Sequence, residues 1–230
     1  MSVYRKYEEF ESGLFSSLVK PGMVVLDVGA GWGHYTCLAA RIVGGEGKVL
    51  AFEPDPDVFR ALARNVRAGR FTNVKLFQCA VSDSSGPRAL SLTGVVGGQS
   101  VQRLGRGART VMTRTAKLDD MPLGKIDLIK MDIDGGEFFA LKGMQRLVNE
   151  NESVMLLLEF WPAYQIASGV NPLSLVDMII GMGFNISEVD FGTRKLRKLD
   201  RQYFVQNPEF STNLLCWRTR NARRAQLSTK

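Results

Sequence analysis

Histidine and cysteine are scarce in this chain of 230 residues, and their scarcity excludes several kinds of site. The only histidine is His34, and the three cysteines, at positions 37, 79 and 216, are far apart and odd in number. This spacing fits neither a disulfide framework nor a zinc site. We therefore expect reduced thiols and a cytoplasmic protein.

Long apolar runs are also missing. The longest, around residues 154–158, has the length of a buried strand, whereas a helix needs about 20 apolar residues to span a bilayer. The first residues, MSVYRKYEEFESG, carry acids where a signal peptide would need an apolar core. We expect neither a membrane span nor export. With 45% hydrophobic and 23% charged residues, one globular domain is the simplest interpretation.

The net charge of +7 is concentrated at one end of the chain. From Asp190 onward there are ten Lys or Arg and three acids, so the preceding residues are neutral overall. Such a basic end is typical of a solvated tail, and it is also typical of an attachment to a polyanion such as RNA.

The hydrophobic pattern alternates between strands and helices. Predicted strands are 24–28, 48–53, 74–80, 127–132, 154–159, 185–191 and 212–218. Predicted helices are 3–19, 35–43, 56–68, 137–148 and one that begins after Asn171 and ends near 181–183. Because parallel strands need crossover connections, this order predicts an α/β fold with helices around a parallel sheet.

The glycine-rich segment 81–118 interrupts the alternation. Short alternating runs at 88–93 and 110–118 predict one hairpin, and a long loop of this type is often a functional lid. We expect an N-terminal helix (1–23), one α/β domain (24–218) and a basic C-terminal tail (219–230).

The segment VVLDVGAGWGH, residues 24–34, contains the first candidate site. A strand ends near Asp27 and is followed by glycines at 29, 31 and 33, while Glu53 ends the second strand. In open parallel sheets ligands bind beyond the carboxyl ends of the strands, where glycines admit a ligand close to the main chain. A carboxylate at the second strand end can accept both hydroxyl hydrogens of a ribose. The pair predicts an adenosine-type ligand.

The spacing of the glycines narrows the choice of ligand. Dinucleotide sites use G-x-G-x-x-G, whereas this turn is G-x-G-x-G with His34 in the place of the last glycine. The phosphate-binding pattern G-x-x-x-x-G-K-[ST] is missing from the chain. A nucleoside without phosphates fits better, and S-adenosylmethionine is the common one. An NAD-linked oxidoreductase and an adenosine-sensing module are the alternatives from other classes.

A resemblance to a known family is carried by four segments: LDVGAGWGHYT, AFEPDP, LDDMPLGKIDLIKMDIDGGEFFALKGM and LLLEFWP. Over residues 24–162 the chain resembles the FkbM-type methyltransferases of class I. The resemblance implies a Rossmann-like, seven-stranded, mostly parallel sheet with helices on both faces and an antiparallel last strand. It also implies methyl transfer from S-adenosyl-L-methionine, usually to a hydroxyl of a sugar, a polyketide or a similar small molecule.

The resemblance further implies a cofactor site built from the strand ends. The implied contacts are Asp27, Gly29, Ala30 and Gly31 at the methionine end, Glu53 and Pro54 at the ribose, Ala80 and Val81 along the adenine, and Asp132 beside the transferring methyl group. Many class I enzymes have an acid where this chain has Ala80, so Asp83 or main-chain atoms would have to hold the adenine amino group.

Methyl transfer to oxygen needs correct positioning and, at most, one general base. The candidate bases are Asp132, Asp134, Glu137 and His34. Asp132 and Asp134 alternate at a strand end and can face one pocket, although Asp134 could instead cap the following helix. Glu137 could stabilise the same helix through its dipole, and a lone histidine is often simply solvated.

The carboxylates after the fourth predicted strand and the aromatic residues after the fifth have further interpretations. The segment DIDGGE is rich in carboxylates and could hold Mg²⁺, but the Asp-Asn pair of catechol-type enzymes is replaced by Glu159-Phe160-Trp161, so we expect no required metal. The aromatic residues Phe160, Trp161 and Tyr164 are candidates for the walls of an acceptor pocket, or they belong to the hydrophobic core. Methylation of RNA ribose through the basic end is the alternative to a small-molecule acceptor.

Overall fold

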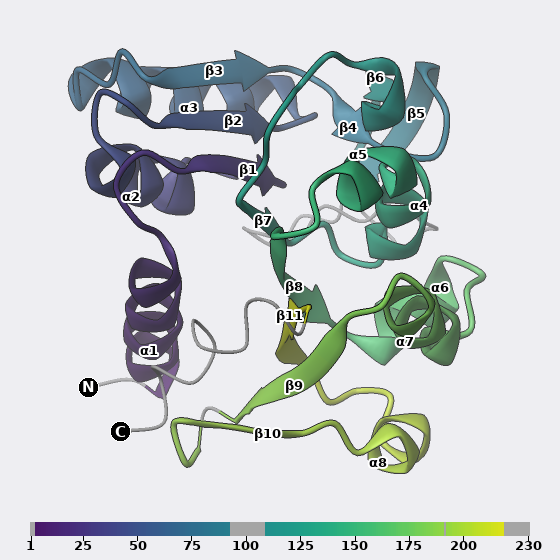
Figure 1. The fold of residues 1–230 in the computed structure, drawn as a ribbon. Coiled ribbons are helices and arrows are strands. Elements are labelled where there is room, and N and C mark those ends of the chain that lie inside the picture. The colour runs from purple at the N-terminus through teal and green to yellow at the C-terminus, as the bar shows by residue number, and fades with distance from the viewer. Residues whose placement is uncertain (1–2, 93–108, 191, 219–230) are drawn as a thin grey trace.

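The computed structural model describes residues 3–92, 109–190 and 192–218. Eight strands form its main sheet: β1 (Val24–Val28), β2 (Lys48–Phe52), β3 (Val74–Phe77), β7 (Leu128–Met131), β8 (Met155–Phe160), β9 (Asn185–Asp190), β10 (Lys195–Lys198) and β11 (Thr212–Trp217). Their order is β10-β9-β11-β8-β7-β1-β2-β3 (Figure 1). Strands β3, β2, β1, β7 and β8 are parallel, and β11 is antiparallel to both β8 and β9. The mostly parallel sheet with an antiparallel last strand is confirmed.

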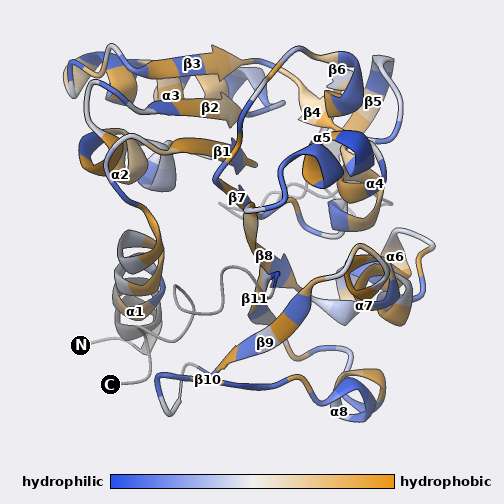
Figure 2. Ribbon diagram, viewed as in Figure 1, coloured by the Kyte–Doolittle hydropathy of each residue, from blue (hydrophilic) through white to orange (hydrophobic). Residues whose placement is uncertain are grey.

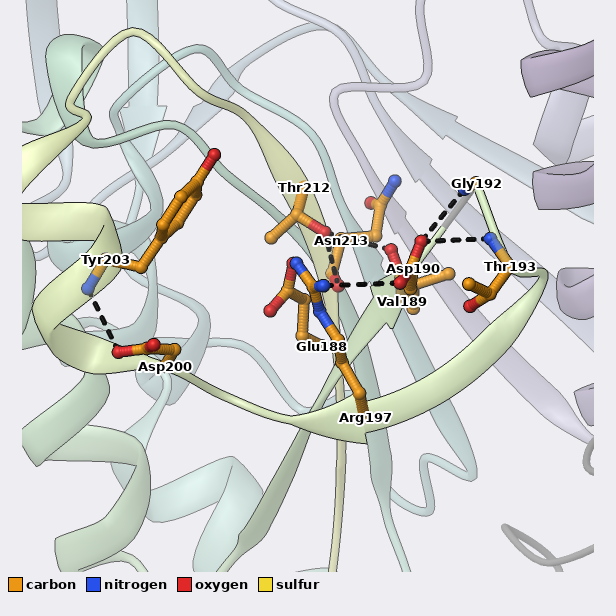
Figure 3. A network of polar contacts seen from close by, with 10 residues as sticks. All are labelled: Glu188, Val189, Asp190, Gly192, Thr193, Arg197, Asp200, Tyr203, Thr212 and Asn213. Atoms are coloured by element: carbon orange, nitrogen blue, oxygen red, sulfur yellow. Dashed lines mark hydrogen bonds and ion pairs between the residues drawn. The ribbon is translucent and has the colours of Figure 1, made fainter.

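The expectation of seven strands is wrong, because β10 adds an eighth strand at the edge beside β9. Arg197 on β10 donates a hydrogen bond of 2.7 Å to Glu188 and lies 3.3 Å from Asp190 (Figure 3). Asp190 also accepts hydrogen bonds from the main-chain N–H groups of Gly192 and Thr193 in the connecting turn. Three of the four residues of β10 are Lys or Arg and Leu196 is its single apolar residue, so no apolar alternation marks the strand in the sequence (Figure 2).

Helices cover both faces of the sheet (Figure 1). One face packs against α1 (Val3–Leu18), α2 (His34–Val43) and α3 (Pro56–Ala68), and the other against α4 (Glu137–Lys142), α5 (Gln145–Glu150) and α7 (Pro172–Gly181). Asp55 caps α3 as predicted, since its carboxylate accepts the N–H of Asp57 at 2.7 Å. Among the described ranges, no helix is long and apolar enough to cross a bilayer.

The predicted helix 137–148 is interrupted, and two short helices were not predicted. Helices α4 and α5 are separated at Gly143 and Met144, where Met144 leaves the helical conformation with a φ of −129°. A Cβ atom on Gly143 would lie 2.0 Å from the carbonyl oxygen of Ser82, so a side chain does not fit at this position. The additional helices are α6 (Pro162–Ala167) and α8 (Arg201–Gln206). Each is only six residues long, which is too short for a clear helical period.

A second sheet forms beside the ends of β2 and β3. It has the order β4-β6-β5 and consists of β4 (Ala80–Val81), β5 (Gly86–Leu92) and β6 (Arg109–Ala116), with the single-turn η1 (Leu118–Asp120) after it. Strands β5 and β6 are the predicted hairpin, paired in antiparallel register. The remainder of the expected lid, 93–108, and the basic tail, 219–230, lie outside the described residues.

Candidate functional site

The carboxyl ends of β1 and β7 meet at the predicted glycine turn. Gly29 has a φ of 83°, and a Cβ atom there would lie 1.9 Å from the carbonyl oxygen of Asp132. Only glycine permits this approach, because a side chain would collide with main-chain atoms that cannot move aside. The turn is tied to β2 as well, since the N–H groups of Gly29 and Ala30 donate to the carbonyl oxygen of Phe52. Two predicted site residues, Gly29 and Asp132, are therefore in contact.

Glu53 connects the first two strand ends. Its side chain is fully buried, with Oε2 accepting the N–H of Gly31 at 2.9 Å and Oε1 accepting the N–H of Asp55 at 2.8 Å. A Cβ atom on Gly31 would meet nothing within 4 Å, so open space lies next to this part of the turn. In this structure the carboxylate of Glu53 fixes the two turns around that space, and its contact with a ribose stays a prediction.

An apolar pocket follows the ends of β1, β2 and β3. It is narrow, with a free volume of about 20 Å³, and its walls are Val28, Gly29, Phe52, Pro54, Cys79, Ala80, Val81, Leu90 and Ile133. Four of the predicted cofactor residues (Gly29, Pro54, Ala80 and Val81) line it. Asp83 does not, because its carboxylate accepts a hydrogen bond of 3.0 Å from Lys142, which lowers its pKa. Its apolar walls are suited to packing against the faces of an aromatic base such as adenine, but the pocket would have to widen to admit one, so the adenine contact stays a prediction.

Asp27 faces the interior beneath α2. Its carboxylate accepts a hydrogen bond of 2.5 Å from Thr36, and burial raises its pKa although that hydrogen bond opposes the shift. Strand alternation explains why the side chain of Asp27 points into the interior, because Asp27 shares its face of the sheet with the buried Val25. Its predicted contact with the methionine end of a cofactor stays a prediction.

Three acids meet beyond β7 and β8. One carboxylate oxygen from each of Asp132, Asp134 and Glu159, here called the acid cluster, lies within 4.8 Å of the other two. Of the three, Asp132 has 40% of its side chain exposed. This spacing is compatible with an oxygen-coordinated divalent cation, so the expectation of no metal stays a prediction. Sequence reasoning did not include Glu159, although a charged residue at the end of an apolar strand was a usable signal.

Burial and mutual repulsion alter the ionisation of these acids. Burial first, and then the neighbouring Asp132 and Glu137, raise the pKa of Asp134 to about 8. Burial and the charge of Asp132 likewise raise the pKa of Glu159 well above its ordinary value. Asp134 does not cap the next helix, since Gly136 holds that position without a side-chain hydrogen bond. At neutral pH the cluster therefore retains protons.

Glu137 is part of the interior support of this edge. It accepts the N–H of Ile133 at 3.1 Å and a short hydrogen bond from the amide of Gln165 on α6, and burial raises its pKa to about 7. Glu137 has 1% of its surface exposed. Both oxygens already have partners, so the arrangement favours support of the loop over contact with an acceptor.

His34 lies on the other side of the glycine turn. It is exposed at the start of α2, and its Nε2 is 2.7 Å from the hydroxyl of Ser12 on α1. Of the three aromatic residues proposed as walls of an acceptor pocket, Phe160 is buried in the core against Phe204. The rings of Trp161 and Tyr164 contact each other, with 4.1 Å between their centroids.

The structure adds a buried cation that sequence reasoning missed. Lys130 on β7 has 1% of its surface exposed, and its Nζ lies 3.4 Å from a carboxylate oxygen of Asp132. The sequence signal was a lysine inside an otherwise apolar strand, because a buried charge requires a partner.

Known proteins that are similar in sequence to this chain are methyltransferases. The family described as the methyltransferase FkbM domain matches residues 27–191. Hexuronic acid methyltransferase AglP of Haloferax volcanii is 26% identical over 158 residues, covering 68% of this chain and 61% of AglP. Methyltransferase sdnD of Sordaria araneosa is 27% identical over 200 residues, covering 71% of this chain and 74% of sdnD. This chain therefore matches about three-fifths of AglP.

Solved structures share the fold. The crystal structure of methyltransferase FkbM from Methylobacillus flagellatus has a TM-score of 0.56 at 19% identity, over 85% of this chain and 43% of that chain. SMU.1697c from Streptococcus mutans, in complex with SAH, has a TM-score of 0.54 at 9% identity, over 91% of this chain and 96% of that chain. Methyltransferases of this fold use S-adenosylmethionine as the methyl donor. Since the family match covers more than half of the residues, this chain belongs to the FkbM methyltransferase family.

Proposed function

We propose that this protein transfers the methyl group of S-adenosylmethionine to a hydroxyl oxygen of a small molecule such as a sugar or a polyketide. The observation that carries the proposal is the position of Asp132. Its main-chain carbonyl contacts the Gly29 turn, while its carboxylate, partly exposed, belongs to the acid cluster at the same edge. A group at this place can meet both a cofactor on the glycine turn and an acceptor arriving from solvent.

The residues at the strand ends fit the cofactor. The apolar pocket beside Ala80 and Val81 suits the adenine ring, and the carboxylate of Glu53 lies next to the open space at Gly31, where a ribose would approach. When bound, S-adenosylmethionine supplies a methyl group on a positively charged sulfur, which keeps the electrons of the broken carbon–sulfur bond. Asp27 supports the turn from inside through its hydrogen bond with Thr36.

The chain's own contribution is to orient the acceptor and to take its proton. Asp132 accepts a hydrogen bond from the acceptor hydroxyl, directs an oxygen lone pair toward the glycine turn, and receives the hydroxyl proton as the new carbon–oxygen bond forms. Asp134, which is mostly protonated at pH 7, can donate a hydrogen bond to the acceptor. Orientation can contribute about 7–11 kcal/mol, and a general base adds about 10²- to 10⁴-fold.

The small-molecule acceptor is supported by a relative. The name of AglP states that it methylates a hexuronic acid, a small polar molecule with several hydroxyls. We carry over only this class, because the two chains are 26% identical and the match covers 61% of AglP. The open edge beside Asp132 is consistent with a soluble, hydroxyl-bearing acceptor.

Two measurements test the proposal. Calorimetry should detect S-adenosylhomocysteine binding, and Glu53→Ala should weaken it at least tenfold, while Glu150→Gln, an exposed acid far from the strand ends, should leave it unchanged. Methyl transfer should then be measured against a panel of sugars, uronic acids and polyketides, with Asp132→Asn expected to lower kcat by about 10²- to 10⁴-fold at nearly unchanged S-adenosylhomocysteine affinity.

Unchanged turnover in Asp132→Asn would remove that residue from the mechanism, and a failure to bind S-adenosylhomocysteine would end the cofactor assignment. Transfer to RNA instead of the panel, with affinity that falls steeply as salt rises, would replace the small-molecule acceptor by the ribose alternative.

A further inference from the structure

We propose that the N-terminal helix α1 is part of the methyl-transfer site, because Glu11 on this helix and the buried Lys130 on β7 together hold the carboxylate of Asp132 in position. The inference rests on the proposed function, which takes Asp132 as the group that meets the acceptor. Helix α1 precedes residues 27–191, the region matched by the family, so family membership does not assign this role.

Lys130 lies between the two acids. Its Nζ is 3.4 Å from Oδ2 of Asp132 and 3.4 Å from Oε1 of Glu11, and it lies 4.8 Å from the centre of the Tyr35 ring. Glu11 is itself buried. The ammonium group therefore has a negative partner on α1, another at the tip of β7, and an aromatic face from α2.

The charge of Lys130 is maintained by the groups around it. These come from every element packed against it: Glu11 on α1, Asp27 on β1, Tyr35 on α2, Asp132 after β7 and Glu159 on β8. Burial disfavours the ammonium form, but the combined attraction of the surrounding groups, with Asp132 and Glu11 foremost, raises the pKa of Lys130 well above its ordinary value. Lys130 stays positively charged throughout the range in which enzyme activity is measured.

This arrangement fixes a carboxylate that would otherwise move. Asp132 follows the last residue of β7, and its side chain is partly exposed, so few contacts restrict its rotation. The ion pair with Lys130 limits where the carboxylate can lie, and Glu11 holds Lys130 on its other side. Because a misplacement of about 1 Å can lower a rate 10²-fold, such support affects turnover. Glu11 and Lys130 are therefore positioning residues that act through Asp132.

Ser12, which follows Glu11 on helix α1, makes a second contact with the site. Ser12 lies 2.7 Å from Nε2 of His34, which directly follows the glycine turn. The helix is a firm platform for both contacts, since Leu14, Phe15 and Leu18 are buried against the sheet and the ring of Phe15 packs edge-on against Tyr35. One face of α1 thus reaches the glycine turn and the tip of β7 together.

The central test is Glu11→Gln, which keeps the size of the side chain and removes its charge. We expect kcat to fall at least tenfold, with S-adenosylhomocysteine affinity and acceptor KM within twofold of the parent. Ser16→Ala is the matched control on the same helix, because Ser16 only donates to the carbonyl oxygen of Ser12, and it should leave kcat unchanged. Glu11→Asp, which keeps the charge and shortens the side chain, should retain more of the parent kcat than Glu11→Gln.

A double-variant cycle separates positioning from general stability. If Glu11 acts through Asp132, then adding Glu11→Gln to Asp132→Asn should lower kcat no further. Additive losses, or a Glu11→Gln kcat equal to that of Ser16→Ala while Asp132→Asn is impaired, would overturn the inference and leave the proposed function intact. Unchanged turnover in Asp132→Asn itself would instead remove the proposed function on which the inference rests.

Discussion

Replacing Asp134 with asparagine should stabilise the folded protein, and the gain should grow as the pH rises. Asp134 has 5% of its surface exposed, and burial together with Asp132 and Glu137 raises its pKa from 3.8 to about 8. Asparagine has nearly the same shape as the protonated acid and tolerates the left-handed backbone at this position, where φ is 48°. The variant therefore removes the titration with little change in geometry.

The sign and size follow from proton linkage. An acid with a higher pKa in the folded state binds its proton more tightly when folded, so its contribution to stability is complete below pH 3.8 and is lost as the pH rises to about 8. Each pKa unit corresponds to about 1.4 kcal/mol, so this group alone lowers the free energy of unfolding by up to about 4 kcal/mol between pH 5 and pH 8.

Urea unfolding followed by circular dichroism at pH 5, 6, 7 and 8, without cofactor, measures this effect. The free energy of unfolding of Asp134→Asn minus that of the parent should increase steadily over the series. Asp177→Asn is the control, because Asp177 is 60% exposed and pairs with Arg201 at the surface; it should stay within about 0.5 kcal/mol of the parent throughout. A difference between Asp134→Asn and the parent that is constant from pH 5 to pH 8 would refute the reasoning.

Three further outcomes are expected. Gly29→Ala should lower S-adenosylhomocysteine affinity more than tenfold by calorimetry, because its Cβ would lie 1.9 Å from a main-chain oxygen of Asp132, whereas Gly13→Ala on α1, with open space around it, should bind normally. EDTA should leave kcat within twofold, since Lys130 already supplies a cation beside the acid cluster; a loss restored by Mg²⁺ would show that a metal is needed. The affinity for S-adenosylmethionine relative to uncharged S-adenosylhomocysteine should rise from pH 6 to pH 9, as Asp134 ionises near the positive sulfur, and a flat ratio would contradict that placement.

Local patterns predicted those parts of the fold that local interactions determine. The Asp55-Pro56 cap, the strand before the glycine turn and the β5–β6 hairpin all follow from neighbouring residues. Strand β10 could not be found in this way, because its four residues include one apolar side chain, and its pairing with β9 and the ion pairs of Arg197 are contacts with other parts of the chain. The packing of Gly143 against Ser82 is likewise a contact between distant residues.

The candidate site was predictable where strand ends determine it. Gly29, Glu53 and Asp132 follow from the rule that ligands bind at the carboxyl edge of a parallel sheet, and the structure places them together there. Glu11 could not be predicted, because its link to Asp132 passes through Lys130 and needs the packing of α1 against the sheet. What the sequence did offer was Lys130 itself, a charge within an apolar strand.

Several features that are unfavourable for stability lie together at the carboxyl end of β7, and their proximity supports a functional interpretation. Asp134 has a left-handed backbone and a buried carboxyl group, and Lys130 carries a charge in the interior. None of these improves packing, and each persists only because surrounding contacts hold it. Removing Lys130 would leave Asp132 and Glu11 without their shared cation. The buried charge of Lys130 on β7 is therefore balanced in part by Glu11 on α1, the helix that precedes the region matched by the family.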